Sequence, residues 1–151
     1  MRSPRLARFF DEYEAYHSHP SNKLCHFIGI PLIVVSSIGL LSGVHFLLAA
    51  VIAAAILLYD ARLSIPLTVP YAAFMGLSFL AASFLSTTIL WSLFVGGWIL
   101  QFVGHYAFEK KSPAFFQNVR QLLVAPLWII EELRGTRSTL ATTPGSARLE
   151  E

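Results

Sequence analysis

A long and almost uncharged stretch limits what this chain can fold into. Between Leu24 and Phe108 the only residues with formal charges are Asp60 and Arg62. About 20 apolar residues cross a bilayer as an α-helix, so a stretch of this length has room for four crossings. The sequence therefore predicts an all-α integral membrane protein, built as a bundle of about four transmembrane helices.

Short turns separate the four predicted spans. We place the spans near 24–42, 45–62, 66–85 and 88–108, where turns of a few residues suit antiparallel neighbours. The first span is not expected to be a cleavable signal peptide, because it starts too far into the chain and more apolar sequence follows at once. Residues 1–134 are predicted to form a single membrane domain. The small, polar residues 135–151 are predicted to be a disordered tail.

Positive charge gathers on one side of the predicted bundle. Four spans place both termini and the 60–66 loop on the same side, and all 11 lysines and arginines fall there. The positive-inside tendency makes this side cytoplasmic, in a bacterial inner membrane or in the endoplasmic reticulum of a eukaryote. The net charge of +2 is too small to argue for nucleic-acid binding, and the expected surroundings are membrane lipid.

Both ends of the domain are predicted to form interfacial helices. Near the C-terminal end, residues 115–134 are aromatic and apolar, but Pro126 breaks them and their charge makes a full crossing unfavourable. We expect a surface or partly inserted helix there. Near the N-terminus, a helix that starts at Ser3-Pro4 would lie on the lipid headgroups. Its apolar face repeats at helical spacing through Leu6, Phe9, Phe10, Tyr13, Tyr16 and His17.

Three of the five histidines fall at the cytoplasmic end of the predicted bundle. His26 lies in the first turn of the first span, His105 in the last turn of the fourth, and His17 just before Pro20 ends the entry helix. His45 begins the second span on the opposite side, about 30 Å away at 1.5 Å per residue. It is predicted to be a capping or interfacial residue.

Polar side chains accompany two of these histidines at helical spacing. Asn22 lies four positions before His26, and Gln101 and Glu109 lie four positions before and after His105. Imidazole is a common metal ligand and usually needs an acceptor on its other ring nitrogen, a role open to these three residues. Histidines near a membrane surface also serve as anchors. From the residues alone, a metal site and a set of interfacial anchors remain alternatives.

Two specific motifs bracket the apolar stretch. The first is H-x4-N-x3-H-x2-G-x-P, which begins at His17, and the second is GWILQFVGHYAFEKKSPA at 97–114. Together they resemble the motifs of a small membrane family of fungal 2-hydroxy fatty acid dioxygenases and their bacterial relatives. The resemblance runs from about Phe10 to about Glu132, and the middle spans match only as apolar sequence.

The resemblance implies an iron(II)-dependent enzyme that consumes molecular oxygen and shortens a 2-hydroxy fatty acid by one carbon through α-oxidation. It implies that His17, His26 and His105 are the iron ligands, and His19 could supply a fourth nitrogen. Glu109 could complete the site as a carboxylate ligand or orient His105 from behind it. We favour the orienting role, because the lysines that follow Glu109 compete for its carboxylate.

The membrane location suits such a substrate. A long acyl chain would lie among the spans while its polar head reaches the metal at the cytoplasmic surface. Lys23, Lys110 and Tyr16 are at that level and could bind the carboxylate, although lysines there also extend to lipid phosphates. Two other functions stay open: a zinc-dependent membrane hydrolase acting on lipid, and a non-catalytic membrane scaffold or small carrier.

Overall fold

The computed structural model describes residues 4–116 and 118–135, and every regular element in these ranges is helical. The all-α prediction is therefore confirmed. Apart from Gly135, the tail predicted at 135–151 lies outside the described residues. In chain order the elements are α1 (Pro4–Ala15), α2 (Pro20–Val44), α3 (Phe46–Ala61), α4 (Ile65–Ala82), α5 (Thr87–Val103), the π-helix η1 (Gly104–Glu109), the 3-10 helix η2 (Ala114–Phe116) and α6 (Arg120–Leu133).

The predicted spans correspond to α2, α3, α4, and α5 with η1. Three segments are long and apolar enough to cross a membrane: Pro20–Val44, Ile65–Ala82 and Thr87–Glu109. The fourth, α3, is equally apolar but has only 16 residues. At 1.5 Å per residue it is about 24 Å long, somewhat less than the roughly 30 Å of a bilayer's hydrocarbon core. The structure thus supplies three to four helices that could span a membrane.

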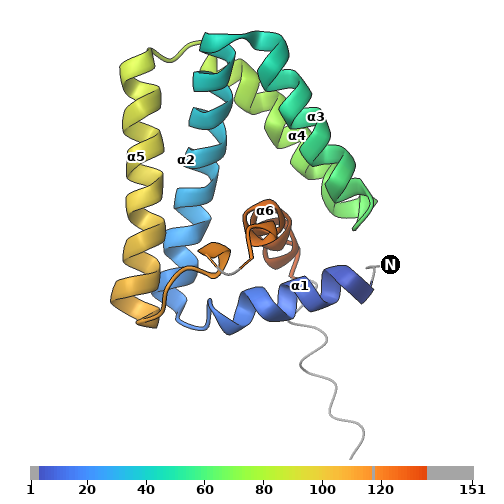
Figure 1. Cartoon of the computed structure of the whole chain (residues 1–151), viewed down its shortest axis with the longest axis vertical. Coiled ribbons are helices and arrows are strands. Elements are labelled where there is room, and N and C mark those ends of the chain that lie inside the picture. The colour runs from blue at the N-terminus through green and yellow to red at the C-terminus, as the bar shows by residue number, and fades with distance from the viewer. Residues whose placement is uncertain (1–3, 117, 136–151) are drawn as a thin grey trace, which may run out of the picture.

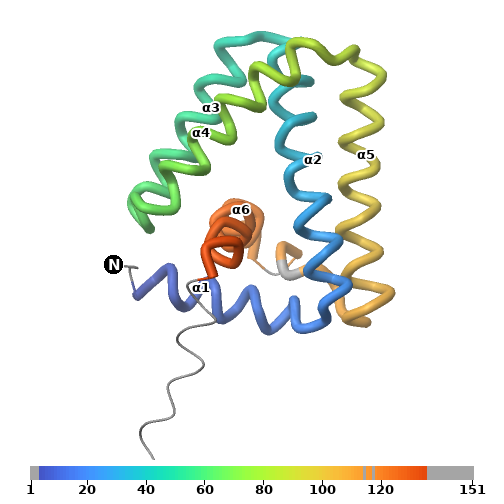
Figure 2. Tube along the Cα trace, turned by 180° about the vertical axis from the view of Figure 1, so that it is seen from behind, coloured from blue at the N-terminus to red at the C-terminus, as the bar shows by residue number. Residues whose placement is uncertain are grey.

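The helices form a wedge (Figure 1). Helices α2 and α5 lie side by side along most of their length, while the α3–α4 hairpin leans away from them. The two pairs meet at one end and separate at the other. Helix α6 lies in the space between them, and α1 crosses the open end, as the reverse view also shows (Figure 2). This arrangement brings the N-terminal segment to the ends of the first and last spans that the charge distribution predicts to be cytoplasmic.

Backbone contact between α2 and α5 depends on two glycines. A Cβ on Gly97 would lie 2.9 Å from the carbonyl oxygen of Gly29 and 2.7 Å from Cγ1 of Ile33. Such contacts are too close for any other residue type, so the missing side chains let the two helices approach, as in other membrane helix pairs. The approach fixes the relative height of the two helices.

We expect the Gly97→Ala variant to be less stable than the native protein, by about 1–3 kcal/mol, because its added methyl group overlaps the facing backbone. The Gly96→Ala variant is the matched control, because a Cβ at Gly96 meets nothing within 4 Å. Thermal unfolding in detergent measures both variants. Equal unfolding temperatures for the two would contradict close backbone packing of α2 on α5.

Helix α6 is packed inside the protein, between the two helix pairs (Figure 1). Val124, Leu127 and Trp128 are completely buried, and α6 continues through Pro126. The predicted break at Pro126 is therefore wrong. Proline costs a helix one hydrogen bond, but here buried side chains on both sides of it pack into the wedge and outweigh that cost.

Helix α1 packs its apolar face on α6, as its sequence pattern predicts. Its buried residues are Leu6, Phe9, Phe10 and Tyr13, and they belong to the same core cluster as those of α6. The helix ends at Ala15, so Tyr16 and His17 do not continue its face as expected. Instead, His17 lies in the connection to α2.

Candidate metal centre

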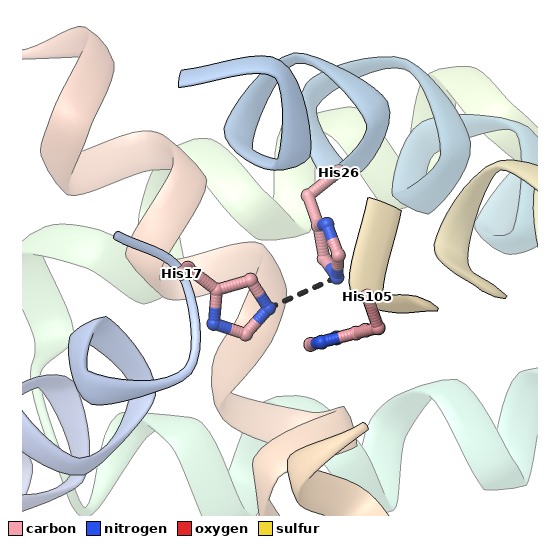
Figure 3. A group of neighbouring side chains, drawn as sticks. All are labelled: His17, His26 and His105. Carbon is pink, nitrogen blue, oxygen red and sulfur yellow. Dashed lines mark hydrogen bonds between the residues drawn. The ribbon is translucent and has the colours of Figure 1, made fainter. Parts of the chain in front are cut away.

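Three histidines from three segments converge at the open end of the wedge (Figure 3). His17 comes from the α1–α2 connection, His26 from α2 and His105 from η1. All three side chains are buried, and one nitrogen from each lies within 4.8 Å of the others. Within residues 4–116 and 118–135, no other group of three histidine, cysteine or acidic side chains is placed to hold a metal. The structure brings together the three histidines that share one end of the sequence-derived bundle.

Backbone hydrogen bonds fix the orientation of two of the rings. Nδ1 of His17 lies 2.5 Å from the backbone carbonyl oxygen of Tyr13. Nδ1 of His26 lies 2.9 Å from the backbone carbonyl oxygen of Asn22. A carbonyl oxygen only accepts, so each Nδ1 carries the proton and donates it. Each Nε2 then keeps a free lone pair. These two Nε2 atoms lie only 3.0 Å apart (Figure 3).

The electrostatics of the cluster suit a cation. Burial, together with the neighbouring His26, lowers the pKa of His17 to about 2. His17 is therefore neutral at cellular pH. When both rings are neutral, their protons lie on the two Nδ1 atoms, so the two Nε2 lone pairs face each other at 3.0 Å and repel. Nδ1 of His105 is also buried and has no hydrogen-bond partner among the described residues. A metal ion between the rings would satisfy these nitrogens, so the residues fit a metal.

Tyr13 holds His17 in place. The two rings stack with centroids 3.8 Å apart and an interplanar angle of 8°. The ring of Trp128 also contacts Tyr13, with their centroids 4.9 Å apart. Because His17 lies outside any helix, this stack and the bond to the Tyr13 carbonyl determine where its ring points. The sequence pattern indicates only that Tyr13 belongs to the apolar face of α1. Its position four residues before His17 was the available signal.

An elongated cavity of about 250 Å³ begins at the three histidines. Its volume is close to the lower end of the range for small-molecule sites, about 300–1,000 Å³. Gln101, one turn before His105, and Gln121 of α6 both line it. No pattern in the sequence predicts the position of Gln121. Most of the other lining residues are aliphatic or aromatic. A histidine cluster that could hold a metal therefore opens directly on an apolar space.

Comparison with known proteins identifies the family of this chain. A model of the family described as "2-hydroxy-palmitic acid dioxygenase Mpo1-like" matches residues 3–137. The chain belongs to the Mpo1-like family. This confirms the resemblance seen in the two motifs. One relative of the Mpo1-like chain is the protein named 2-hydroxy-palmitic acid dioxygenase MPO1 of Saccharomyces cerevisiae, which is 33% identical over 140 residues, 80% of this chain and 74% of the relative. No solved structure matches the chain.

Glu109 of the Mpo1-like chain holds the loop that carries His17. Its carboxylate accepts hydrogen bonds from the Ser18 hydroxyl at 2.8 Å, the His19 backbone N–H at 2.6 Å and the Asn22 amide at 3.2 Å. The expected α-helical stripe through Gln101, His105 and Glu109 does not continue to its end, because residues 104–109 form a π-helix. Such wider turns are common at functional sites, and this one directs Glu109 to the loop.

The two remaining histidines lie outside the cluster. Nδ1 of His19 accepts a hydrogen bond from the Ser21 backbone N–H at 3.1 Å, and its exposed ring stacks on Phe108. His19 thus caps the start of α2, and the structure does not bring it to the other three. His45 is exposed between α2 and α3, at the opposite end of α2 from His26.

The residues expected near a substrate carboxylate do not line the cavity. The ammonium of Lys23 lies 3.4 Å from a carboxylate oxygen of Glu132 and 5.4 Å from the Trp128 ring centroid. Lys110 is exposed and has a left-handed backbone with a φ of 55°. The Tyr16 carbonyl accepts from the Asn22 amide.

We expect the Glu109→Gln variant to bind metal about tenfold more weakly, because residues that support metal ligands contribute about 10–100-fold to affinity. A glutamine cannot accept all three hydrogen bonds that hold the loop, so His17 would be less well positioned. Metal affinity measured by competition with a chelator tests this. Glu132→Gln, which alters only a part-exposed ion pair, is the control and should change affinity little. Equal affinities of the two variants would contradict the positioning role.

Proposed function

We propose that this Mpo1-like protein is an iron(II)-dependent dioxygenase that shortens 2-hydroxy fatty acids by one carbon through α-oxidation. Its family and its likeness to the yeast enzyme support dioxygenase activity on a 2-hydroxy fatty acid. The observation that carries the proposal is the buried three-histidine cluster at one end of an apolar cavity. This combination suits a substrate with a polar, metal-binding head and a hydrocarbon tail.

The activity of the family supports iron over zinc. Zinc has no redox chemistry, whereas a dioxygenase has to pass electrons to oxygen, and imidazole ligands suit iron as well as zinc. When bound, iron(II) supplies the electrons that activate dioxygen and leaves coordination positions open beside the imidazoles.

The proposed reaction balances with one molecule of oxygen. The bond between C1 and C2 breaks, and C2 is oxidised from an alcohol to a carboxylic acid. The original carboxyl carbon leaves as carbon dioxide. One oxygen atom enters the new carboxyl group, and the other forms water with the two remaining hydrogens.

The protein's own residues bind and orient the substrate. Among the described residues, no lysine or arginine lines the cavity, so the negative charge of the substrate head has to be balanced at the histidine cluster. The acyl chain would extend along the aliphatic wall away from it. This apolar wall also excludes water from the reacting end. The predicted contacts of Lys23, Lys110 and Tyr16 with the carboxylate would require these side chains to move.

We place the histidine end of the bundle at the cytoplasmic surface. Lys23 and Lys110 lie next to the cluster in sequence, and the α3–α4 turn with Arg62 lies at the same end of the wedge (Figure 1). This distribution supports the predicted cytoplasmic location of both termini. A reactive site at this depth can receive a substrate directly from the adjacent leaflet.

The test is oxygen uptake by purified protein whose metal is removed and then replaced anaerobically with iron(II) or zinc. With 2-hydroxypalmitate, we expect only the iron-loaded protein to consume oxygen, with one carbon dioxide and one shortened fatty acid formed per oxygen molecule. Oxygen-independent lipid hydrolysis by the zinc form would instead favour the hydrolase. A protein that retains no metal would favour the scaffold or carrier.

A further inference from the structure

The cavity follows α2 for much of the helix's length. His26 and Leu41 both line it, and the 15 positions between them (41 − 26) correspond to about 22 Å at 1.5 Å per residue. An extended chain advances about 1.2 Å per bond, since the three backbone bonds of a residue span about 3.3–3.6 Å. The path is therefore as long as an extended chain of about 18 carbons. The α2 side chains that border it are His26, Ile30, Ile33, Val34, Ser37, Ile38 and Leu41.

Two alanines of α3 form the wall of the far part of the cavity. Ala49 and Ala53 both line it and are 2% and 8% exposed, respectively. Because α3 runs antiparallel to α2 after the turn at His45, Ala49 lies toward the Leu41 end and Ala53 one turn closer to the histidines. The two alanines are separated by about 6 Å along the helix, which corresponds to about five carbons.

We propose that Ala49 and Ala53 set the longest acyl chain that the enzyme accepts. The inference rests on the proposed function, because it assigns the substrate tail to this cavity with its head at the histidines. Methyl side chains leave open the space that the last carbons fill. A larger side chain at either position would close the cavity at its own depth, so the limit should shorten in steps along α3.

The experiment measures oxygen uptake by iron-loaded variants with 2-hydroxydecanoate, 2-hydroxypalmitate and 2-hydroxystearate. For Ala53→Phe we expect activity on the two longer acids to fall at least about tenfold, while activity on 2-hydroxydecanoate stays within about twofold. For Ala49→Phe we expect the loss to be concentrated on 2-hydroxystearate. Ala54→Phe is the matched control, because Ala54 is exposed on the same helix and outside the cavity.

The outcomes separate this inference from the function on which it rests. If the native protein oxidises none of the three acids, the proposed function fails. If it oxidises them and Ala53→Phe has the same chain-length profile as Ala54→Phe, the length limit is overturned. If the phenylalanine variants do not fold, the Leu41→Ala variant provides a second test. Removing the Leu41 side chain should raise the relative activity on acids longer than 2-hydroxystearate, and an unchanged profile would overturn the inference.

Discussion

The His26→Ala variant should retain no stoichiometric metal and lose at least about 100-fold of its oxygen uptake. Residues that only orient a metal ligand already contribute about 10–100-fold, and His26 supplies one of the converging nitrogens itself. Its Nε2 lies 3.0 Å from that of His17, and its Nδ1 is tied to the Asn22 carbonyl. Alanine would leave two imidazoles facing an enlarged space. Metal analysis of the purified variant and oxygen uptake with 2-hydroxypalmitate measure both losses.

The His45→Ala variant is the control for that experiment. His45 is the same residue type, but it is exposed and lies 19 positions further along the chain (45 − 26), at the other end of α2. Its removal should leave metal content and activity unchanged. The metal-site assignment would be contradicted if His26→Ala kept its metal, or if the two variants lost metal equally.

Much of the candidate metal centre could be predicted from the sequence, because the depth of its histidines follows from helix length. His26 and His105 occupy the start of the first span and the end of the last, so any antiparallel bundle with an even number of spans brings them to one end. Pro20 separates His17 from α2 and leaves it in a connection at that same end. Helical spacing likewise indicated that Asn22 would lie beside His26. The group that accepts from the His26 ring is, however, the backbone carbonyl of Asn22, and its side-chain amide donates to Tyr16 and Glu109 instead.

The cavity could not be predicted from the same patterns. It exists because the α3–α4 hairpin leans away from α2 and α5, and apolar spans carry little signal about the angles between them (Figure 1). Pro126 gave a misleading signal for α6, because the packing of residues such as Trp128 decides whether that helix continues. The π-helix at 104–109 was also not visible in the spacing. It lets Glu109 reach the loop of Ser18 and His19 instead of continuing an α-helical stripe.

These differences share one physical cause. Residue spacing along a helix determines which side chains share a face and a depth, but packing between helices determines which faces meet. The α2–α5 contact is an exception, because Gly29 and Gly97 allow close approach only on one side of each helix. Where large apolar side chains such as Leu127 and Trp128 fill the space instead, many packings satisfy the same pattern. The site is therefore most predictable where it depends on α2 and α5, and least where it depends on α6.

The Tyr13→Ala variant should be the most damaging change outside the three histidines. Deleting a buried aromatic side chain costs about 3–5 kcal/mol, and Tyr13 is 3% exposed between His17 and Trp128. The loss would also free the His17 ring, which no helix holds. We therefore expect a lower unfolding temperature together with metal affinity weakened at least about tenfold, by analogy with other residues that orient ligands. Thermal unfolding and chelator competition measure the two effects separately.

The Tyr13→Phe variant separates the role of the ring from that of the hydroxyl. Burial raises the pKa of this hydroxyl, so it stays protonated, and it has no hydrogen-bond partner among the described residues. An unpaired buried donor costs about 1–3 kcal/mol, so phenylalanine should preserve metal affinity and leave stability equal or higher. Loss of metal in Tyr13→Phe would show that the hydroxyl, and not the stacked ring, supports the site. Native affinity in Tyr13→Ala would show that the Tyr13 carbonyl alone positions His17.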